Sequence, residues 1–343
     1  MTDDVLTAAI DALASRRDLQ RDEAAAVLAE IMHGNATEVQ IAAFLIALRT
    51  KGETQDELAG LAQTMRAFAT PVKPRREDLL DTAGTGGGRR TFNISTTAAL
   101  IAAGAGCAVA KHGNRSATGL SGSADVLEAL GARLDLSPES EARAIDETGF
   151  GFMFAPAHHA ATRFVVPVRR DLAVRTVFNL LGPLTNPAGA RRQLVGVADP
   201  SSLELVAGAL SRLDTEHALV VSSADGLDEL STSGPTHVVE VEGQSMRSYD
   251  LEPEDVGIPR ADPDAVSGGT PDENAAFTWA ILAGEPGARL DIALLNAGAA
   301  IYAAGGAASI AQGVEAARDA VESGAATATL EAYVALSQEL VGA

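Results

Sequence analysis

The sequence predicts an α/β fold in which a small helical N-terminal domain precedes a larger α/β domain with a mostly parallel central sheet. Residues 21–71 carry three successive helix patterns and no strand pattern. From residue 107 onward, short apolar runs alternate with helical patterns, which is typical of parallel strands joined by helices. We therefore expect a helical domain over residues 1–72 and an α/β domain over residues 73–343, with a helical segment near 160–185 joining the former.

The three N-terminal helix patterns have recognisable start and stop signals. In the first, over residues 21–33, Asp22 is the expected N-cap and Gly34 the stop. The other two are expected to open with capping boxes, formed by Thr37 with Gln40 and by Thr54 with Glu57. Residues 71–78, "PVKPRRED", are rich in proline and charge and are predicted to be a linker.

In the second part, strand and helix patterns alternate. The expected strands are residues 107–110, 149–155, 192–198 and 217–224, and the helices between them are residues 122–131, 161–173 and 201–213. Residues 237–243 and 244–252 are then predicted to pair as strands, followed by core helices over 274–284 and 292–306 and an amphipathic surface helix over 309–324.

Composition limits the partners and the compartment. The chain has 46 acidic and 26 basic residues and a net charge of −20, which disfavours binding to nucleic acid or to an anionic membrane. No apolar stretch reaches the roughly 18 residues that span a bilayer. Cys107 is the only cysteine, so no internal disulfide is possible, and we expect a reducing, cytoplasmic environment.

The stretch "DTAGTGGGRRTFNIST", residues 81–96, contains a glycine run just before a helix start. Glycines let backbone N–H groups converge on an anion, and the N-terminus of the following helix is itself an anion site. A dinucleotide-binding loop is the alternative, but it requires an acidic residue at the end of the next strand. The chain has "KHGNRS" there, residues 111–116, so the two strand ends together favour a ligand with several phosphates.

Two further loops complete the pattern. Ser121, Gly122 and Ser123 precede another helix start. Asp228 and Glu229 are adjacent and follow the expected strand 217–224. Neighbouring carboxylates at a strand end suit Mg²⁺, which binds carboxylates together with substrate phosphates. A solvated acidic turn is the alternative interpretation of this pair.

The motifs "GTGG…TFNIST", "KHGNRS", "GSADVLEALG", "VRTVFNLLGPLTNPA" and "GLDELS" occur in an order and spacing that resembles the anthranilate phosphoribosyltransferase family almost from end to end. The resemblance implies a nucleoside phosphorylase/phosphoribosyltransferase-like fold with the active site between its two domains. It also implies a homodimer that joins anthranilate to 5-phosphoribosyl 1-diphosphate with Mg²⁺ and releases diphosphate.

The resemblance assigns site residues by matching positions. The phosphoribosyl diphosphate ligands implied are Gly84, Gly87, Gly88, Thr91, Asn93, Ile94, Ser95, Thr96, Lys111, His112, Gly113, Asn114, Arg115, Ser116, Thr118, Gly119 and Ser123. The anthranilate contacts implied are Gly84, Asn114, His112, His159 and Arg169. The metal contacts implied are Ser95, Asp228 and Glu229. No general acid or base is assigned, since an aromatic amine is already neutral at pH 7.

The chain departs from the family's pattern at three places. In the glycine loop, Gly87-Gly88-Arg89-Arg90 replaces a Gly-Asp-Gly sequence and one residue is missing before Thr91; Thr118-Gly119 replaces paired serines; and Ala160 replaces a proline after His159. We hypothesise that Arg89 or Arg90 points inward and holds diphosphate directly; solvent-exposed arginines are the alternative.

Two other functions stay open at this stage. One is a related phosphoribosyltransferase or a nucleoside phosphorylase with a different nucleophile, against which Asn114 and Arg169 favour a carboxylate-bearing aromatic amine. The other is a non-catalytic nucleic-acid-binding relative, which the acidic charge and the Asp228–Glu229 pair oppose. The remaining histidines have no metal-ligand spacing, and we expect them to be structural.

Overall fold

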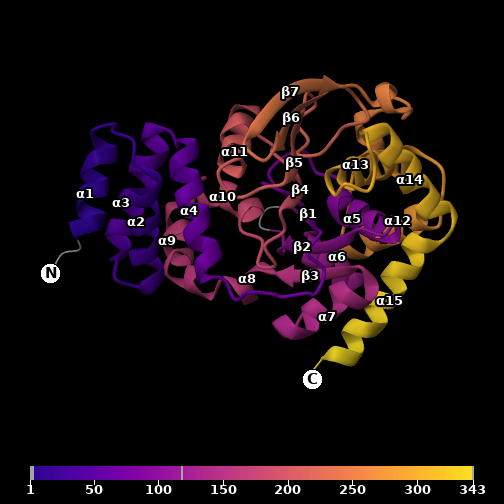
Figure 1. Ribbon diagram of the computed structural model, residues 1–343, viewed down its shortest axis with the longest axis horizontal. Helices are drawn as coiled ribbons and strands as arrows, with labels where there is room; N and C mark the ends of the chain where they lie inside the picture. Colours follow the sequence, from indigo (N-terminus) through magenta and orange to yellow (C-terminus); the bar gives the residue numbers. More distant parts are fainter. Residues whose placement is uncertain (1–3, 117–118, 342–343) are drawn as a thin grey trace.

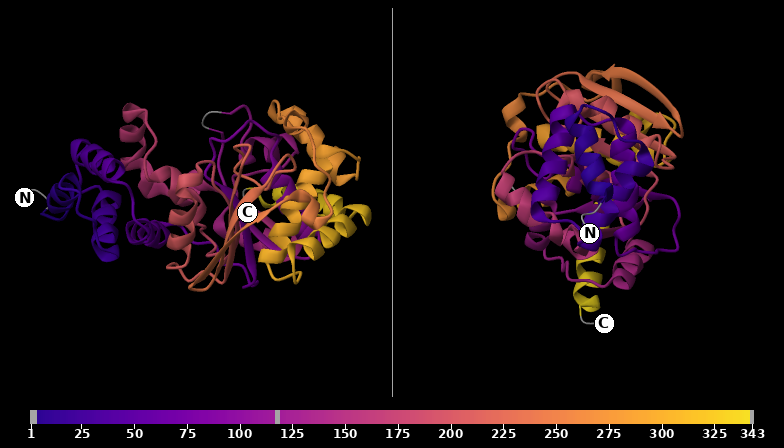
Figure 2. Two further views of the ribbon diagram at one scale, coloured as in Figure 1. Left: turned by 90° about the horizontal axis from the view of Figure 1, so that it is seen from above. Right: turned by 90° about the vertical axis from the view of Figure 1, so that its left-hand side faces the viewer.

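The structure is a computed structural model that describes residues 4–116 and 119–341. The molecule is elongated, with helices α1–α4 at one end of the long axis and a sheet covered by helices at the other (Figure 1). The two further views in Figure 2 show the same arrangement, with the chain's first helices at the tip of the molecule. Among the described residues, no helix is long and apolar enough to cross a membrane.

The N-terminal helices are α1 (Asp4–Ala14), α2 (Arg21–His33), α3 (Glu38–Lys51) and α4 (Gln55–Phe68). Both predicted capping boxes are present, at Thr37 and at Thr54. The predicted cap at Asp22 is wrong, because Gln20 is the N-cap, and its backbone N–H donates to Glu23 Oε2 at 2.8 Å. Asp22 lies in the first turn instead, where its charge still favours the helix dipole.

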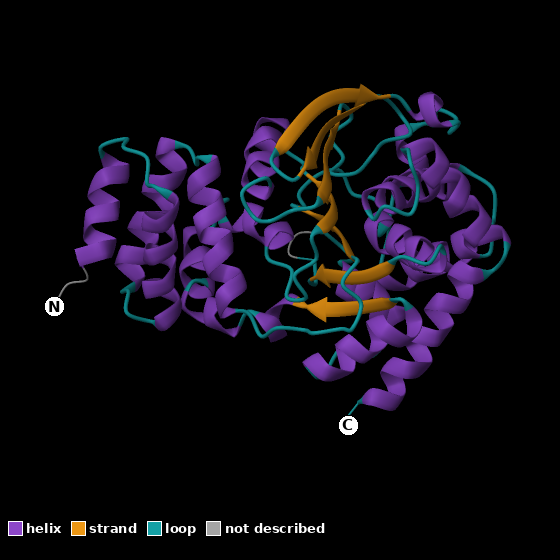
Figure 3. Cartoon of the chain, viewed as in Figure 1, coloured by secondary structure: helices purple, strands orange, loops and turns teal. Residues whose placement is uncertain are grey.

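A seven-stranded sheet forms the centre of the larger part, with strand order β3-β2-β1-β4-β5-β6-β7 (Figure 3). The strands are β1 (Leu79–Gly84), β2 (Ala108–Gly113), β3 (Phe150–Phe154), β4 (Arg192–Gly196), β5 (His217–Ser223), β6 (Thr236–Glu242) and β7 (Ser245–Leu251). The first five strands are parallel and β6 and β7 join antiparallel, so the mostly parallel sheet and the final strand pair are confirmed.

Both faces of the sheet are buried, as a parallel sheet requires. Successive residues alternate between two cores: Leu194 and Leu219 belong to one, and Val195 and Val220 to the other. The first core contains α5 (Ile94–Gly104), α12 (Pro271–Leu282), α13 (Ala288–Ala303), α14 (Ile310–Glu322) and α15 (Ala325–Leu340). Helix α6 (Ser123–Ala129) packs with them, whereas α7 (Pro138–Thr148) packs on β3.

The second core connects the sheet to the N-terminal helices. Helix α11 (Leu203–Leu210), after the short turn η3 (Pro200–Ser202), packs on β5 and on α4. Between β3 and β4 the chain forms α8 (Ala155–His158), η1 (Ala160–Phe164), α9 (Val166–Leu172), α10 (Phe178–Leu181) and η2 (Gly182–Leu184). Of these, α9 packs on α3 and η1 on α2. Two further turns, η4 (Pro253–Val256) and η5 (Pro263–Val266), follow β7.

Candidate active site

The predicted site residues gather at the carboxyl ends of the parallel strands. Strand β1 lies between β2 and β4, so the chain leaves β1 toward one side of the sheet and later returns to the other. Ligands of open α/β sheets bind where the strand order reverses in this way. The glycine run follows β1, the "KHGNRS" sequence spans the end of β2 and the loop after it, and the Asp228–Glu229 pair lies in the loop after β5.

The glycine loop after β1 depends on the absence of side chains. Gly86 and Gly87 have φ angles of +66° and +86°, a region that residues with a Cβ atom rarely adopt. A Cβ atom on Gly84 would lie 2.6 Å from Asp228 Oδ2, and one on Gly88 would lie 2.8 Å from the carbonyl oxygen of Gly226. The loop therefore packs directly against the segment that carries the two carboxylates.

Asp228 and Glu229 lie against the anion-binding elements. Asp228 Oδ2 accepts the N–H of Gly86 at 2.9 Å, and the Glu229 carboxylate lies beside the backbone of Ser95 in the first turn of α5. Burial, together with the neighbouring charge of Asp228, raises the pKa of Glu229 to about 8. Burial also raises the pKa of Asp228. Arg175 and Lys111 act in the opposite direction on Asp228 and Glu229, respectively, but burial outweighs them, so an added cation would favour the charged forms of both carboxylates.

Lys111 is the cation closest to this pair in the protein interior. It belongs to β2 rather than to the predicted loop, and it is only 2% exposed. Its Nζ donates to the backbone oxygen of Thr82, to Thr82 Oγ1 at 3.1 Å and to Ser95 Oγ at 3.3 Å. Burial lowers the pKa of Lys111, while Asp81 and Glu229 act in the opposite direction.

Asp81 and Asn186 form a hydrogen-bonded pair that holds β2 in place. This contact was not predicted from the sequence. Asn186 Nδ2 donates to Asp81 Oδ2 and to the Ala110 carbonyl oxygen, both at 2.8 Å. Asp81 Oδ1 in turn accepts the N–H of His112 at 3.1 Å. Burial raises the pKa of Asp81. The "NPA" sequence after η2 thus fixes the position from which the His112 side chain extends.

His112 and His159 come from different segments and lie together, with ring centroids 5.1 Å apart. The backbone of Gly182 lies beside the His112 ring and that of Thr185 beside the His159 ring, while the Nε2 atom of each ring is buried and unpartnered among the described residues. Burial and the neighbouring histidines lower the pKa of His112 to about 3 and that of His159 to about 4. Both rings are therefore neutral and present an unused acceptor nitrogen.

The start of α5 is held by side chains from distant segments. Asn93 Oδ1 accepts from Ser121 Oγ at 3.0 Å and from Asn274 Nδ2 at 2.9 Å. Asn93 thus links the glycine loop to the loop before α6. Its side chain does not cap α5. The first helical residue, Ile94, is buried in the core, so only its backbone faces the loop.

The loop after β2 is organised from within. Asn114 Oδ1 accepts the N–H of Arg115 at 2.7 Å, and its carbonyl oxygen accepts Ser123 Oγ at 3.2 Å. The Arg115 guanidinium pairs with Asp125 and Glu128 on α6. The remaining predicted ligands of this loop are Ser116, whose Oγ accepts the N–H of Gly119 at 2.7 Å, and Thr118, which lies outside the described residues.

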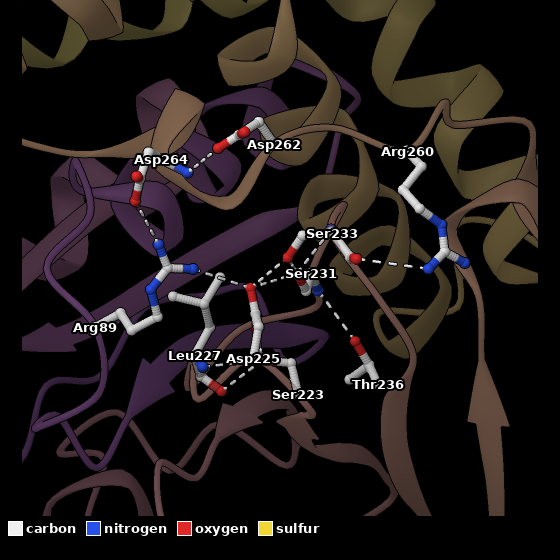
Figure 4. Close-up of polar contacts among 10 residues, drawn as sticks. All are labelled: Arg89, Ser223, Asp225, Leu227, Ser231, Ser233, Thr236, Arg260, Asp262 and Asp264. Carbon is white, nitrogen blue, oxygen red and sulfur yellow. Dashed lines mark hydrogen bonds and ion pairs between the residues drawn. The ribbon is translucent and has the colours of Figure 1, made fainter.

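Arg169 and Arg89 are placed differently from each other. Arg169 is half-buried on α9 with its guanidinium carbon 5.4 Å from the Phe178 ring centroid, and it forms no ion pair within the described part of the chain. Arg89 instead pairs with Asp225 and Asp264, each at 3.2 Å (Figure 4). The hypothesis that Arg89 points inward to hold diphosphate is therefore wrong for this structure, in which two carboxylates already hold its guanidinium. Arg90 is exposed.

The residues around Asp228 and Glu229 fit a magnesium ion. Two carboxylates and the Ser95 hydroxyl are the hard oxygen donors that Mg²⁺ takes. Neither carboxylate forms an ion pair within the described residues, so both oxygen donors remain available to a metal ion. A cluster of His217, Glu240 and Glu242 also satisfies metal-ligand spacing, but Glu240 is already occupied by Arg247 and two tyrosine hydroxyls.

Comparison with known proteins extends over nearly the whole chain. A model of the glycosyl transferase family helical bundle domain matches residues 7–69, and one of its a/b domain matches residues 76–327. The anthranilate phosphoribosyltransferase of Symbiobacterium thermophilum is 52% identical, with 93% of this chain and 94% of the relative covered. That of Chloroflexus aurantiacus is 54% identical, with 96% and 98% covered.

Comparison with solved structures identifies the same family. A crystal structure of anthranilate phosphoribosyltransferase from Thermus thermophilus matches with a TM-score of 0.92 and 47% identity, covering 96% of this chain and 99% of that one. The enzyme from Saccharomyces cerevisiae in complex with PRPP and Mg matches with a TM-score of 0.88 and 26% identity, covering 98% of both chains. The chain belongs to the anthranilate phosphoribosyltransferase family.

Proposed function

We propose that the protein transfers the phosphoribosyl group of 5-phosphoribosyl 1-diphosphate to anthranilate, giving N-(5-phosphoribosyl)anthranilate and diphosphate in tryptophan biosynthesis. The observation that carries this proposal is the joining of three elements at one sheet edge. The N–H of Gly86 donates to Asp228, and the Glu229 carboxylate lies beside the backbone of Ser95, so the glycine loop, the α5 start and the acidic pair form one site.

The reaction needs one bond broken and one formed. The C1–oxygen bond of the ribose breaks, diphosphate leaves with the electron pair, and the amine nitrogen of anthranilate forms the new bond to C1 and loses a proton. The glycine-loop amides and the α5 N-terminus stabilise the charge that develops on the leaving group. The predicted ligands in the loops after β1 and β2 hold the substrate in the orientation for attack.

The carboxylates of Asp228 and Glu229 and the hydroxyl of Ser95 are proposed as the groups that would hold Mg²⁺. Bound there, the ion would supply positive charge that favours departure of diphosphate. The Asp228 carboxylate is pre-positioned for this role, since it already accepts the N–H of Gly86.

Anthranilate is proposed to bind against Asn114, His112, His159 and Arg169. Arg169 has no carboxylate partner in the described chain and offers two parallel donors to the substrate carboxylate. The neutral rings of His112 and His159 lie side by side, tilted by 57° to each other, and each has an unpartnered Nε2 atom, which suits an aromatic amine that carries N–H donors. A strong base is unnecessary because the amine attacks in its neutral form.

The direct test is the loss of anthranilate fluorescence when phosphoribosyl diphosphate and Mg²⁺ are added. We expect Mg²⁺-dependent loss with stoichiometric release of diphosphate. A parallel incubation of pyrimidine and purine nucleosides with orthophosphate tests the alternative phosphorylase. Nucleoside cleavage without anthranilate turnover would replace the proposal with that alternative.

A homodimer is proposed as the working form, and the apolar outer face of α3 supports it. Val39 is 78% exposed and Ile46 36% exposed, and they lie seven residues apart, on one side of the helix. Light scattering of the parent and of Val39→Asp tests this, with a fall to monomer mass expected for the variant.

Three further statements stay predictions: a cytoplasmic location, the absence of nucleic-acid partners and the domain boundary at residues 72/73.

A further inference from the structure

Arg175 reaches the glycine loop from the segment that connects α9 to α10. Helix α9 ends at Leu172, and its C-cap, Ala173, has a left-handed φ of +52°. Val174 and Arg175 are exposed, and Thr176 is buried again. The Arg175 Nη2 atom donates to the carbonyl oxygen of Gly86 at 3.4 Å, across 89 residues of sequence.

The glycine loop leaves room for this guanidinium. A Cβ atom at Gly87 would lie 1.8 Å from Arg175 Nη2, so any side chain at this position would displace the arginine. Gly87 is thus required both by its positive φ and by the cation that lies against it. The contact therefore depends on the absence of a side chain at Gly87.

The charge of Arg175 is not neutralised by an ion pair. In residues 4–116 and 119–341, no carboxylate lies in ion-pair contact with it, and its hydrogen bond goes to a carbonyl oxygen. The loop itself contains no acidic residue between Gly84 and Asn93. Other arginines near the site differ, because Arg89 and Arg115 each contact two carboxylates.

We propose that Arg175 is a further binding residue for the diphosphate group of the substrate, an inference that rests on the proposed function. When diphosphate occupies the glycine loop, the guanidinium exchanges the weak hydrogen bond to Gly86 for charge-assisted bonds to diphosphate oxygens. Because Arg175 follows α9, which packs on α3, this bond connects the anion to the N-terminal helices. The extra positive charge also stabilises diphosphate as it departs.

The test compares Arg175→Ala, Arg175→Gln and Arg175→Lys with Arg170→Ala as a matched control. Arg170 is exposed on α9, five residues before Arg175, and pairs with its neighbour Asp171, so its replacement removes the same charge from a nearby position. Calorimetric titration with diphosphate and Mg²⁺ measures binding without turnover. Steady-state kinetics then give KM for each substrate, and thermal unfolding checks that the variants fold.

We expect the alanine and glutamine variants to bind diphosphate about ten- to a hundred-fold more weakly, with a similar rise in KM for phosphoribosyl diphosphate and little change in KM for anthranilate. The lysine variant should recover part of the loss, since it keeps the charge but not the two-pronged donor. Arg170→Ala should match the parent.

Parent-like diphosphate affinity in Arg175→Ala at low and moderate salt would overturn the inference while leaving the proposed function intact. An equal loss of diphosphate affinity in Arg170→Ala would overturn it too, because the loss would then follow from the change in net charge rather than from a contact made by Arg175. A parent protein that binds no diphosphate would overturn both the inference and the proposed function.

Discussion

Replacing Arg89 should loosen the glycine loop without removing a direct substrate contact. The loop is tied to the segment 225–229 by the Arg89 guanidinium, by the Arg89 N–H bond to the Gly226 carbonyl oxygen at 3.2 Å, and by the Gly86 N–H bond to Asp228. Asp225 is well fixed to receive the guanidinium, because three serine hydroxyls donate to its carboxylate (Figure 4).

The size of the effect follows from exposure. The side chains of Arg89 and Asp225 are 31% and 16% exposed, so the pair is worth about 1 kcal/mol, at the upper end for ion pairs near the surface. Asp264 is 91% exposed, and its contact adds little. A loss of about 1 kcal/mol in loop order should raise KM for phosphoribosyl diphosphate about fivefold, with KM for anthranilate nearly constant.

The assay is a double-mutant cycle on KM for phosphoribosyl diphosphate and on thermal stability. Arg89→Ala and Asp225→Asn should have similar effects, and the double variant should be no worse than either alone. Arg260→Ala is the control, since Arg260 pairs with Glu252 and Glu254 on the outer side of the same network. If Asp225→Asn kept the parent KM while Arg89→Ala raised it, the arginine would be meeting diphosphate directly and our reasoning would be refuted.

Three further predictions concern the acidic pair, the acceptor site and the far edge of the sheet. Asp228→Asn with Glu229→Gln should abolish Mg²⁺-dependent turnover while circular dichroism shows an intact fold; near-normal rates would remove the metal assignment. Arg169→Ala should lower kcat/KM for anthranilate about ten- to a hundred-fold, with Arg163→Ala as control; a change in KM for phosphoribosyl diphosphate instead would put Arg169 in the other pocket. Burial alone would raise the pKa of Glu240, but hydrogen bonds from His217, Tyr302 and Tyr249 lower it to about 2. The Glu240 carboxylate therefore stabilises the folded protein above about pH 4.5, and this stabilisation is lost as the pH falls toward 2. Glu240→Gln should therefore lower the free energy of unfolding at pH 7 by at most about 3 kcal/mol, and Tm with it. The difference in Tm between variant and parent should disappear near pH 2; a difference that does not change with pH would contradict this.

Local signals in the sequence were sufficient for much of the fold. The capping boxes at Thr37 and Thr54 were predictable because all their partners lie within three residues. Asp22 was predicted as a cap because aspartate is common there, whereas the actual cap, Gln20, is a residue type that the rule does not favour. The order of strands was not predictable, since the position of β1 between β2 and β4 depends on packing across the whole domain.

The two arginines of the glycine loop region illustrate what sequence leaves open about a site. Arg89 stands beside the glycines in the sequence, which favours a role in holding the anion, but Asp225, 136 residues away, takes its guanidinium. Arg175 lies 89 residues from Gly86 and carries no local signal of anion binding, yet its guanidinium lies against Gly87. A cation's role depends on which carboxylates the fold brings to it, so the arginine left without one is the stronger candidate for a substrate anion.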